Sequence, residues 1–225
     1  MIGYSKFVLL LQSIFSKINT YILGKRKNVS IGRKSVVFYK SDIVNKSLSG
    51  GVIIGDFCLI GRTAKGYHSG MPFYTQILND GVKSNIVIGN RCRLNGAYIH
   101  AQKNIVIGDN CVFATGVSII DSNGHELYSC DRTVGRDEPV EIEIGSNVWI
   151  GLNAVILKGS VIGDNSVISA NSVVKGCFPR NSLISGNPGK LVKILNIENN
   201  ERNKDLRDRS RLCGPAACKA VFHKV

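Results

Sequence analysis

The sequence is poor in aromatic residues and lacks several common nucleotide-binding motifs. Phe, Trp and Tyr make up 7 % of its 225 residues, whereas hydrophobic residues make up 44 % and there are 24 glycines. This composition predicts one domain, with small additions, whose core consists of small aliphatic side chains, as is typical of repetitive β structure. The chain has no GxxxxGKS/T loop and no GxGxxG motif after a strand, so ATP and NAD sites have no support.

Paired cysteines are also absent. None of the seven cysteines stands in a CxxC pair, so neither a disulfide framework nor a zinc site is expected. Cys58, Cys92 and Cys111 each lie four residues after the isoleucine of an Ile-Gly pair, which indicates a shared position for a small buried residue. Unpaired cysteines favour a reducing compartment, and we expect a cytoplasmic location.

No hydrophobic run is long enough to cross a bilayer. The longest one near the N-terminus, FVLLLQSIF at 7–15, is too short and lacks a small-residue cleavage site, so neither a transmembrane segment nor a signal peptide is expected. An amphipathic helix fits this segment, either packed on the domain or lying on a membrane surface as a peripheral contact.

The chain is strongly basic. Its 29 Lys and Arg against 16 Asp and Glu give a net charge of +13, which favours anionic partners such as phosphates, an acidic polysaccharide or a membrane surface. Nucleic acid is not the expected partner, because no arginine-rich helix, RNP-like aromatic pair or zinc finger accompanies the charge.

The C-terminal half contains a repeat of six residues. From residue 144 the chain reads IGSNVW, IGLNAV, ILKGSV, IGDNSV, ISANSV and VKGCFP. A helix of period 3.6 would spread the aliphatic first positions around its whole surface, whereas a short strand plus a turn repeats in six. The pattern therefore predicts a solenoid whose aliphatic residues stack from coil to coil, with Ile144, Ile150, Ile156, Ile162, Ile168 and Val174 at these first positions.

Earlier rows share the frame, but two segments interrupt it. Rows begin at Ile54, Ile88 and Ile107, and the irregular spacing between Ile54 and Ile88 predicts a loop at 62–85. Between Ile107 and Ile144 the segment DSNGHELYSCDRTVGRDEPVE, 121–141, has no hexad character and is expected to leave the solenoid as a loop. Loops that leave a repeat structure commonly carry its function.

These repeats, with the segment ILKGSVIGDNSVISANSVVKGCFP and the exit motif Gly-x-Pro-x-Lys at Gly186 to Lys190, resemble the hexapeptide-repeat acyltransferases. The resemblance covers about residues 50–192 and is greatest to bacterial sugar and polysaccharide O-acetyltransferases. It implies an all-β fold, a left-handed parallel β-helix with coils of 18 residues, over 51–192. A homotrimer with active sites between subunits is implied as well. Residues 1–50 are expected to form an N-terminal helix and cap.

His125 follows directly on a strand into the 121–141 loop. The segment IIDSNGH, 119–125, resembles the part of the family that leads into the active site, and the resemblance implies that His125 is the general base. Imidazole titrates near neutral pH, which suits removal of a proton from an attacking hydroxyl. Asp121 either orients the imidazole or shapes the turn, and the sequence leaves both open.

The resemblance also indicates where acetyl-CoA would bind, with no metal required. It places Trp149, the one tryptophan, beside the pantetheine end and the acetyl group; a ring covering the outer face of the solenoid is the alternative. Backbone groups at Gly159, Ser160 and Ala170 are implied to hold the pantetheine arm. The phosphates would meet cations at Lys175, Arg180 and Lys190.

The expected activity is acetyl-CoA-dependent O-acetylation of a sugar hydroxyl, with an acceptor that the basic charge suggests is acidic. N-acetylation of an amino-sugar nucleotide stays open. A metal-dependent carbonic anhydrase would need three histidine ligands, and this sequence has no matched third histidine. A non-catalytic β-helix would need no loop of this kind. Residues 193–225 are expected to form a charged helical or disordered tail, and the final segment LCGPAACKAVFHKV to be of artificial origin.

Overall fold

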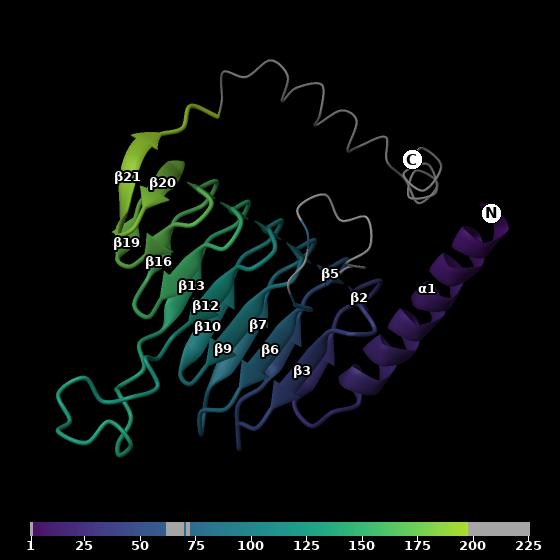
Figure 1. Cartoon of the computed structure of the whole chain (residues 1–225), viewed down its shortest axis with the longest axis horizontal. Helices are drawn as coiled ribbons and strands as arrows, with labels where there is room; N and C mark the ends of the chain where they lie inside the picture. Colours follow the sequence, from purple (N-terminus) through teal and green to yellow (C-terminus); the bar gives the residue numbers. More distant parts are fainter. Residues whose placement is uncertain (1, 62–69, 71–72, 198–225) are drawn as a thin grey trace. The chain divides into compact units, whose positions relative to one another are not determined.

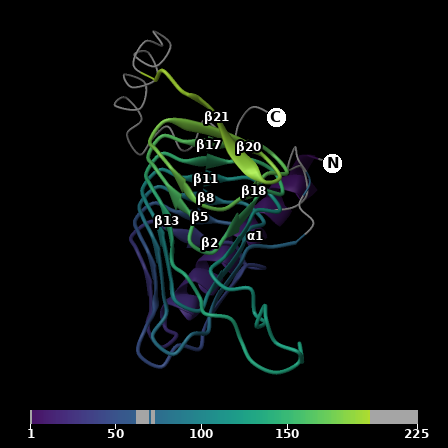
Figure 2. The same ribbon diagram turned by 90° about the vertical axis from the view of Figure 1, so that its left-hand side faces the viewer.

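The computed structural model describes residues 2–61, 70 and 73–197, with the side chains of 2–7 and 9 left out. One helix, α1 (Ile2–Gly24), precedes a stack of coils, and each coil contributes one short strand to each of three parallel sheets (Figures 1 and 2). This is the predicted left-handed parallel β-helix. The predicted tail and the segment 212–225 lie outside the described residues, apart from 193–197.

The three sheets are the three sides of the solenoid. The first sheet consists of β1 (Val29–Ile31), β4 (Val52–Ile54), β7 (Asn85–Ile88), β10 (Asn104–Ile107), β13 (Ile142–Ile144), β16 (Val161–Ile162) and β19 (Cys177–Phe178). The second consists of β2 (Val36–Val37), β5 (Leu59–Ile60), β8 (Arg93–Leu94), β11 (Val112–Phe113), β14 (Trp149–Ile150), β17 (Val167–Ile168), β20 (Ser182–Gly186) and β21 (Gly189–Ile194). The third consists of β3 (Asp42–Asn45), β6 (Gln76–Asn79), β9 (Tyr98–Ala101), β12 (Ser118–Ile120), β15 (Val155–Leu157) and β18 (Val173–Val174).

The hexad isoleucines form the core because the register places them directly above one another. On the first sheet, Ile88 pairs with Ile107, and Ile107 with Ile144. All three are almost completely buried. Cys58, Cys92 and Cys111 are buried as well, which confirms the prediction of a small buried residue at their shared position. At the corners, Asn110, Asn147 and Asn165 have φ near +59°, a left-handed conformation that asparagine tolerates better than most residues.

Three predicted ranges differ from the structure. The solenoid begins at Val29, inside the range 1–50 that was predicted as helix and cap, because the first coil has a single Ile-Gly pair and shows little of the repeat. The predicted 62–85 loop contains a regular strand, β6, which pairs with β3 and β9. At the other end, β21 turns back antiparallel to β20 and extends to Ile194, two residues beyond the predicted boundary.

Candidate functional site

The segment 121–141 leaves the solenoid between β12 on the third sheet and β13 on the first. It projects from the corner between these two sheets, away from the stacked coils (Figures 1 and 2). Its return is hydrogen-bonded to the solenoid, since the Val140 N–H donates to the Asp121 carbonyl at 2.9 Å and the Gly159 N–H donates to the carbonyls of Val140 and Glu141. Both ends of the loop are thus fixed to the coils.

His125 lies exposed in this loop, and one of its ring nitrogens is held. Nδ1 lies 2.8 Å from the backbone carbonyl of Arg132. A carbonyl oxygen can only accept, so Nδ1 carries the proton and the neutral imidazole keeps its lone pair on Nε2. The Arg132 guanidinium in turn donates to the Glu126 carbonyl at 2.9 Å, which closes the loop around the histidine.

Asp137 accepts hydrogen bonds from the segment that leads into His125. No motif in the sequence had pointed to this residue. Its carboxylate is nearly enclosed and accepts hydrogen bonds from the Ser122 hydroxyl at 2.6 Å, the Asn123 N–H at 2.7 Å and the Gly124 N–H at 2.9 Å. The three donors are consecutive residues that end immediately before His125. Asp137 therefore determines the path of the backbone at the candidate base.

Lys158 connects this group to the solenoid. It follows β15, and its Nζ lies 2.6 Å from Asp137 Oδ2 and 2.9 Å from the Glu138 carbonyl oxygen. Burial alone would raise the pKa of Asp137, but the hydrogen bonds from Lys158, Ser122 and the two backbone N–H groups outweigh it and hold the pKa at about 2. Asp137 is therefore an anion throughout the neutral range.

Asp121 does not orient His125. It is fully buried, and its two carboxylate oxygens accept from the backbone N–H groups of Gln102 and Lys103 at 2.7 and 2.8 Å. Within the described part of the chain no hydrogen bond joins it to the imidazole. Burial raises the pKa of Asp121, with these N–H donors opposing the shift. Of the two roles that the sequence left open, the contacts support shaping of the corner.

A second histidine, His100, pairs with a carboxylate. It lies on β9 of the third sheet, and its Nε2 is 2.8 Å from Oδ1 of Asp80, with both side chains about one-fifth exposed. Such a pair can orient an imidazole for proton transfer, so His100 is a competing candidate base. The coil spacing contained the signal, because Leu78 and His100 are directly opposite in the register and Asp80 lies two residues after Leu78.

Trp149 lies on β14 of the second sheet, with its side chain on the outer face and 56 % exposed. It stands between Val112 and Val167 of the adjacent coils. The second sheet is the side of the solenoid opposite the corner from which the 121–141 loop emerges. A single chain therefore keeps Trp149 and His125 on different sides of the molecule.

The predicted cofactor residues lie at three corners and do not form one groove within a chain. Gly159, Ser160 and Lys175 lie between the third and first sheets, Arg180 between the first and second, and Ala170 between the second and third; Lys190 lies on β21. Ser160 is fully buried, its hydroxyl donates to the Leu157 and Val174 carbonyls, and its own carbonyl accepts from the Glu143 N–H at 3.0 Å, so the predicted role of its backbone stays a prediction. The Gly159 N–H is also occupied, by the loop carbonyls.

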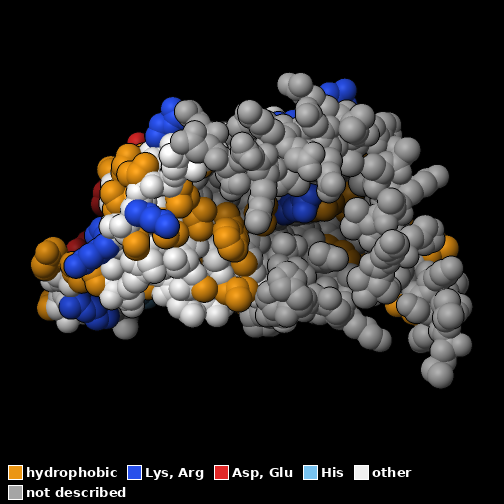
Figure 3. Space-filling model, turned by 90° about the horizontal axis from the view of Figure 1, so that it is seen from above, with side chains coloured by type: hydrophobic (Ala, Val, Ile, Leu, Met, Phe, Trp, Pro, Cys, Tyr) orange, Lys and Arg blue, Asp and Glu red, His pale blue; other side chains and the backbone are white. Residues whose placement is uncertain are grey.

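The remaining positions fit a ligand that carries amides and phosphates. Ala170 is exposed in a turn, and its N–H makes no hydrogen bond to any described residue, so it is free to donate to an amide carbonyl. Lys175, Arg180 and Lys190 are exposed cations. Basic and hydrophobic side chains are interspersed on the described surface, with few acidic ones, where the molecule is seen from above (Figure 3).

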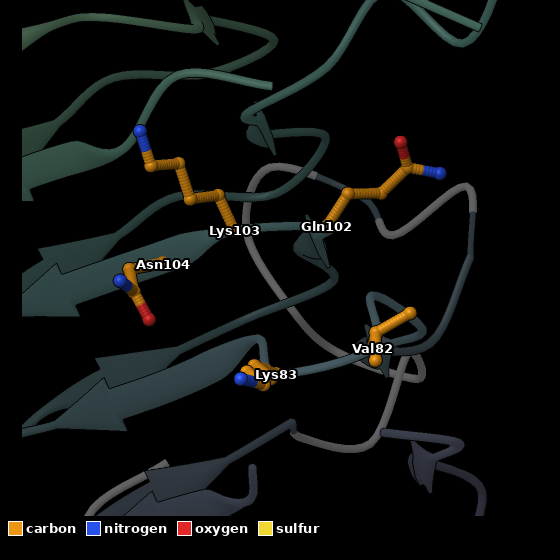
Figure 4. A pocket seen from close by; sticks show the side chains of 5 residues that line it. All are labelled: Val82, Lys83, Gln102, Lys103 and Asn104. Carbon is orange, nitrogen blue, oxygen red and sulfur yellow. The ribbon is translucent and has the colours of Figure 1, made fainter. Parts of the chain in front are cut away.

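A shallow hollow of about 510 Å³ lies beside the corner that Asp121 supports. Val82, Lys83, Gln102, Lys103 and Asn104 line it, with the side chains of Gln102 and Lys103 extending in different directions from one turn (Figure 4). None of the predicted site residues lines it. Among residues 2–61, 70 and 73–197, no three His, Cys, Asp or Glu side chains are grouped to hold a metal ion.

Comparison with known proteins indicates the class to which the repeat is similar. Residues 141–176 match the family model described as bacterial transferase hexapeptide (six repeats). The polysialic acid O-acetyltransferase of Escherichia coli O1:K1 / APEC is 36 % identical over 112 residues, which is 49 % of this chain and 36 % of that protein. The Escherichia coli K12 protein WbbJ, named for lipopolysaccharide biosynthesis O-acetyl transfer, is 33 % identical over 45 % of this chain and 57 % of that protein.

Solved structures show the same fold. An acetyl coenzyme A complex of a hexapeptide-repeat acetyltransferase from Vibrio cholerae O1 biovar eltor has a TM-score of 0.51 at 21 % identity, with 86 % of this chain and 92 % of that chain covered. The polySia specific acetyltransferase NeuO has a TM-score of 0.52 at 24 % identity, with 79 % and 86 % covered. The chain spans 36 to 63 % of the length of the curated relatives that it matches.

Proposed function

We propose that the protein is an acetyl-CoA-dependent O-acetyltransferase that acts on a sugar hydroxyl in bacterial surface-polysaccharide biosynthesis. The observation that carries the proposal is the contact of His125 Nδ1 with the Arg132 carbonyl at 2.8 Å in an exposed loop, which supports the tautomer with its lone pair on Nε2. The match of the repeat to the transferase family and the names of two relatives, in polysialic acid and lipopolysaccharide acetylation, support the choice of reaction and acceptor.

In this proposal the side chains of the protein move one proton and position two substrates. Acetyl-CoA supplies the acetyl group as a thioester. His125 Nε2 accepts the proton of the acceptor hydroxyl as its oxygen attacks the thioester carbon, which contributes about 10²- to 10⁴-fold in rate. The carbon–sulfur bond then breaks, and the proton passes from the imidazole to the departing coenzyme A sulfur. Trp149 offers an exposed aromatic surface to the pantetheine end, and the free Ala170 N–H offers a donor to the pantetheine arm. Lys175, Arg180 and Lys190 would neutralise the phosphates.

The same placement of residues supports a homotrimer, which we propose as the assembly. His125 and Trp149 lie on different sides of one solenoid, so the base and the acyl donor meet only if a neighbouring subunit supplies one of them. The outer faces also carry exposed aliphatic residues, including Val106 and Val161 on the first sheet and Val112 on the second. Packing of three solenoids side by side would cover such residues.

The acceptor and the location are inferred from charge and from cysteines. A net charge of +13 favours an acidic sugar over a neutral one by electrostatic attraction. The described cysteines are all free thiols, of which Cys130 and Cys177 are exposed, and free exposed thiols are typical of the reducing cytoplasm. No helix in the described part of the chain is long and apolar enough to span a membrane.

The test is thiol release from acetyl-CoA with a panel of neutral sugars, acidic sugars, capsule fragments and amino-sugar nucleotides, followed by mass spectrometry of the product. We expect turnover with a hydroxyl acceptor and an ester that mild alkali removes. An alkali-stable product formed only from amines would replace the proposal by N-acetylation. Absence of coenzyme A binding by calorimetry would overturn acyl transfer altogether.

A further inference from the structure

Helix α1 packs on the solenoid mainly through polar side chains, with Leu23 buried in the core at the C-terminal end of the helix. Ser16 is nearly buried, and its hydroxyl accepts from the Tyr39 N–H at 3.3 Å. The Thr20 hydroxyl accepts from the Val37 N–H at 2.8 Å, and the Asn19 side-chain amide donates to the carbonyls of Phe38 and Ser41 at 3.0 and 3.1 Å. These bonds satisfy the backbone next to β2, which is the edge strand of the second sheet. The open end of the solenoid therefore explains why this face of the helix is polar.

The opposite face of α1 is apolar and exposed. The exposed fraction lies between 44 % and 67 % for each of six large side chains, Leu10, Ile14, Phe15, Ile18, Tyr21 and Ile22. Their spacing of three, four and seven residues places them along one side of the helix. This arrangement is the reverse of an ordinary surface helix, whose apolar side faces the core. Capping of the solenoid gives no reason for a continuous outer apolar face of this size.

Cations predominate in the charge around this face. Residues 1–41 contain no Asp or Glu and eight Lys or Arg, at positions 6, 17, 25, 26, 27, 33, 34 and 40, of which Arg26 and Arg33 are paired with Asp42 and Asp56. Lys17 is exposed on α1 and Lys25 is exposed directly after its last residue, and Lys25 Nζ lies 5.3 Å from the centre of the Tyr21 ring, at the C-terminal end of the apolar face. An apolar face with cations beside it complements a bilayer surface that carries anionic headgroups.

We propose that the outer face of α1, defined by Leu10, Ile14, Phe15, Ile18, Tyr21 and Ile22 with Lys17 and Lys25, docks the protein on an anionic membrane surface. The helix would lie in the plane of the interface, because its polar side stays bonded to the first coil. The excess of cations favours lipid over a second copy of this chain, whose own α1 would bring further positive charge to the contact. The inference does not depend on the acetyltransferase activity.

The test is flotation of the full chain with vesicles of phosphatidylcholine, with and without phosphatidylglycerol at about a third of the lipid. We expect binding to the anionic vesicles to be tighter by about 10-fold or more, and to weaken as salt is added. The variant with Ile14→Ser and Ile18→Ser should lose binding, and the variant with Lys17→Gln and Lys25→Gln should lose the preference for anionic lipid. The variant with Leu48→Ser and Val82→Ser, two exposed side chains outside α1, is the matched control and should bind as the parent does.

Circular dichroism and light scattering on the same samples separate the contrary outcomes. The substituted side chains point outward, so each variant should keep the spectrum of the parent. Equal binding to both vesicle types, or retention by the Ile14→Ser and Ile18→Ser variant, would overturn the proposal. A smaller oligomer for that variant, together with absence of vesicle binding by the parent, would assign the face to contacts between copies instead.

Discussion

Lys158 Nζ and Asp137 Oδ2 lie 2.6 Å apart, and this ion pair joins the loop that carries His125 to the body of the solenoid. The lysine belongs to the coil that follows the loop in the sequence, and the aspartate belongs to the part of the loop that returns to the solenoid. The same carboxylate accepts hydrogen bonds from the N–H groups of Asn123 and Gly124. The position of the candidate base thus depends on a contact between residues 21 positions apart.

Replacing Asp137 by Asn should reduce turnover because the Asn123 and Gly124 N–H groups lose a charged acceptor. A displacement of about 1 Å at His125 is enough to lower kcat by up to ~10²-fold. Hydrogen exchange should show faster exchange of these two amides. Glu138→Gln is the matched control, since this exposed neighbouring side chain makes no hydrogen bond or ion pair with any described residue and turnover should be retained. Unchanged exchange in Asp137→Asn would contradict the positioning role.

Asp137 should also make the protein less stable in acid. Its pKa is about 2 in the folded chain against an ordinary value of 3.8, so the folded state binds the proton less readily than the unfolded state. The contribution is complete above pH ~3.8 and is lost as the pH falls toward 2, and its size is about 1–2 kcal/mol. Urea unfolding across this window measures it. Asp137→Asn should have a smaller slope of stability against pH there, and an identical slope would mean that other carboxylates carry the acid sensitivity.

The two histidines can be separated by matched substitutions. His125→Asn should lower kcat by ~10²-fold or more with little change in the Kd of coenzyme A, because only the proton acceptor is removed. His100→Asn should retain most of the turnover, because we expect the contact between His100 and Asp80 to hold β9 and its neighbouring strand together rather than to serve catalysis. The measurement is steady-state kinetics with calorimetric binding of coenzyme A. The reverse pattern would assign the base to the His100–Asp80 pair.

The hexad predicted the solenoid well because the same physical requirement recurs in each coil. A side chain such as Ile144 is buried by its equivalents in the coils on both sides, so its type follows from its position in the repeat. The first coil was not predicted because it has a single Ile-Gly pair and shows little of the repeat. Strand β6 was missed because the segment that precedes it, which includes 62–69, broke the spacing on which the prediction depended.

The site was less predictable because its contacts do not follow the repeat. Asp121 lies outside the hexad pattern, and its partners Gln102 and Lys103 belong to the preceding coil. No repeat in the sequence predicts the shape of the corner where they meet. Asp137 and Lys158 form no motif, and their contact depends on the path of the loop. His125 was found from its local segment, and its hydrogen bond to the Arg132 carbonyl required the folded loop.

Asp121→Asn tests the role that the structure gives to this carboxylate. An asparagine has one acceptor oxygen and one amide group, so one of the two backbone N–H groups at Gln102 and Lys103 would lose its partner and face a donor instead. We expect a loss of about 1–3 kcal/mol in the free energy of unfolding. The pH dependence of turnover should be unchanged, as measured on protein kept below its unfolding transition. A shift in the kinetic pKa would revive an effect of Asp121 on the imidazole.

Mixed oligomers test whether His125 and Trp149 come from different subunits. Trp149→Ala alone should raise the KM for acetyl-CoA by on the order of 10-fold, because the ring no longer covers the thioester end. When Trp149→Ala chains and His125→Asn chains are assembled together, about one quarter of the interfaces should combine the intact histidine of one with the intact tryptophan of the other. Turnover should then exceed the mean of the two parents. Chains with both substitutions, mixed with His125→Asn chains, should show no such gain. If the first mixture shows none either, both residues act within one chain and the loop must bend back to the second sheet.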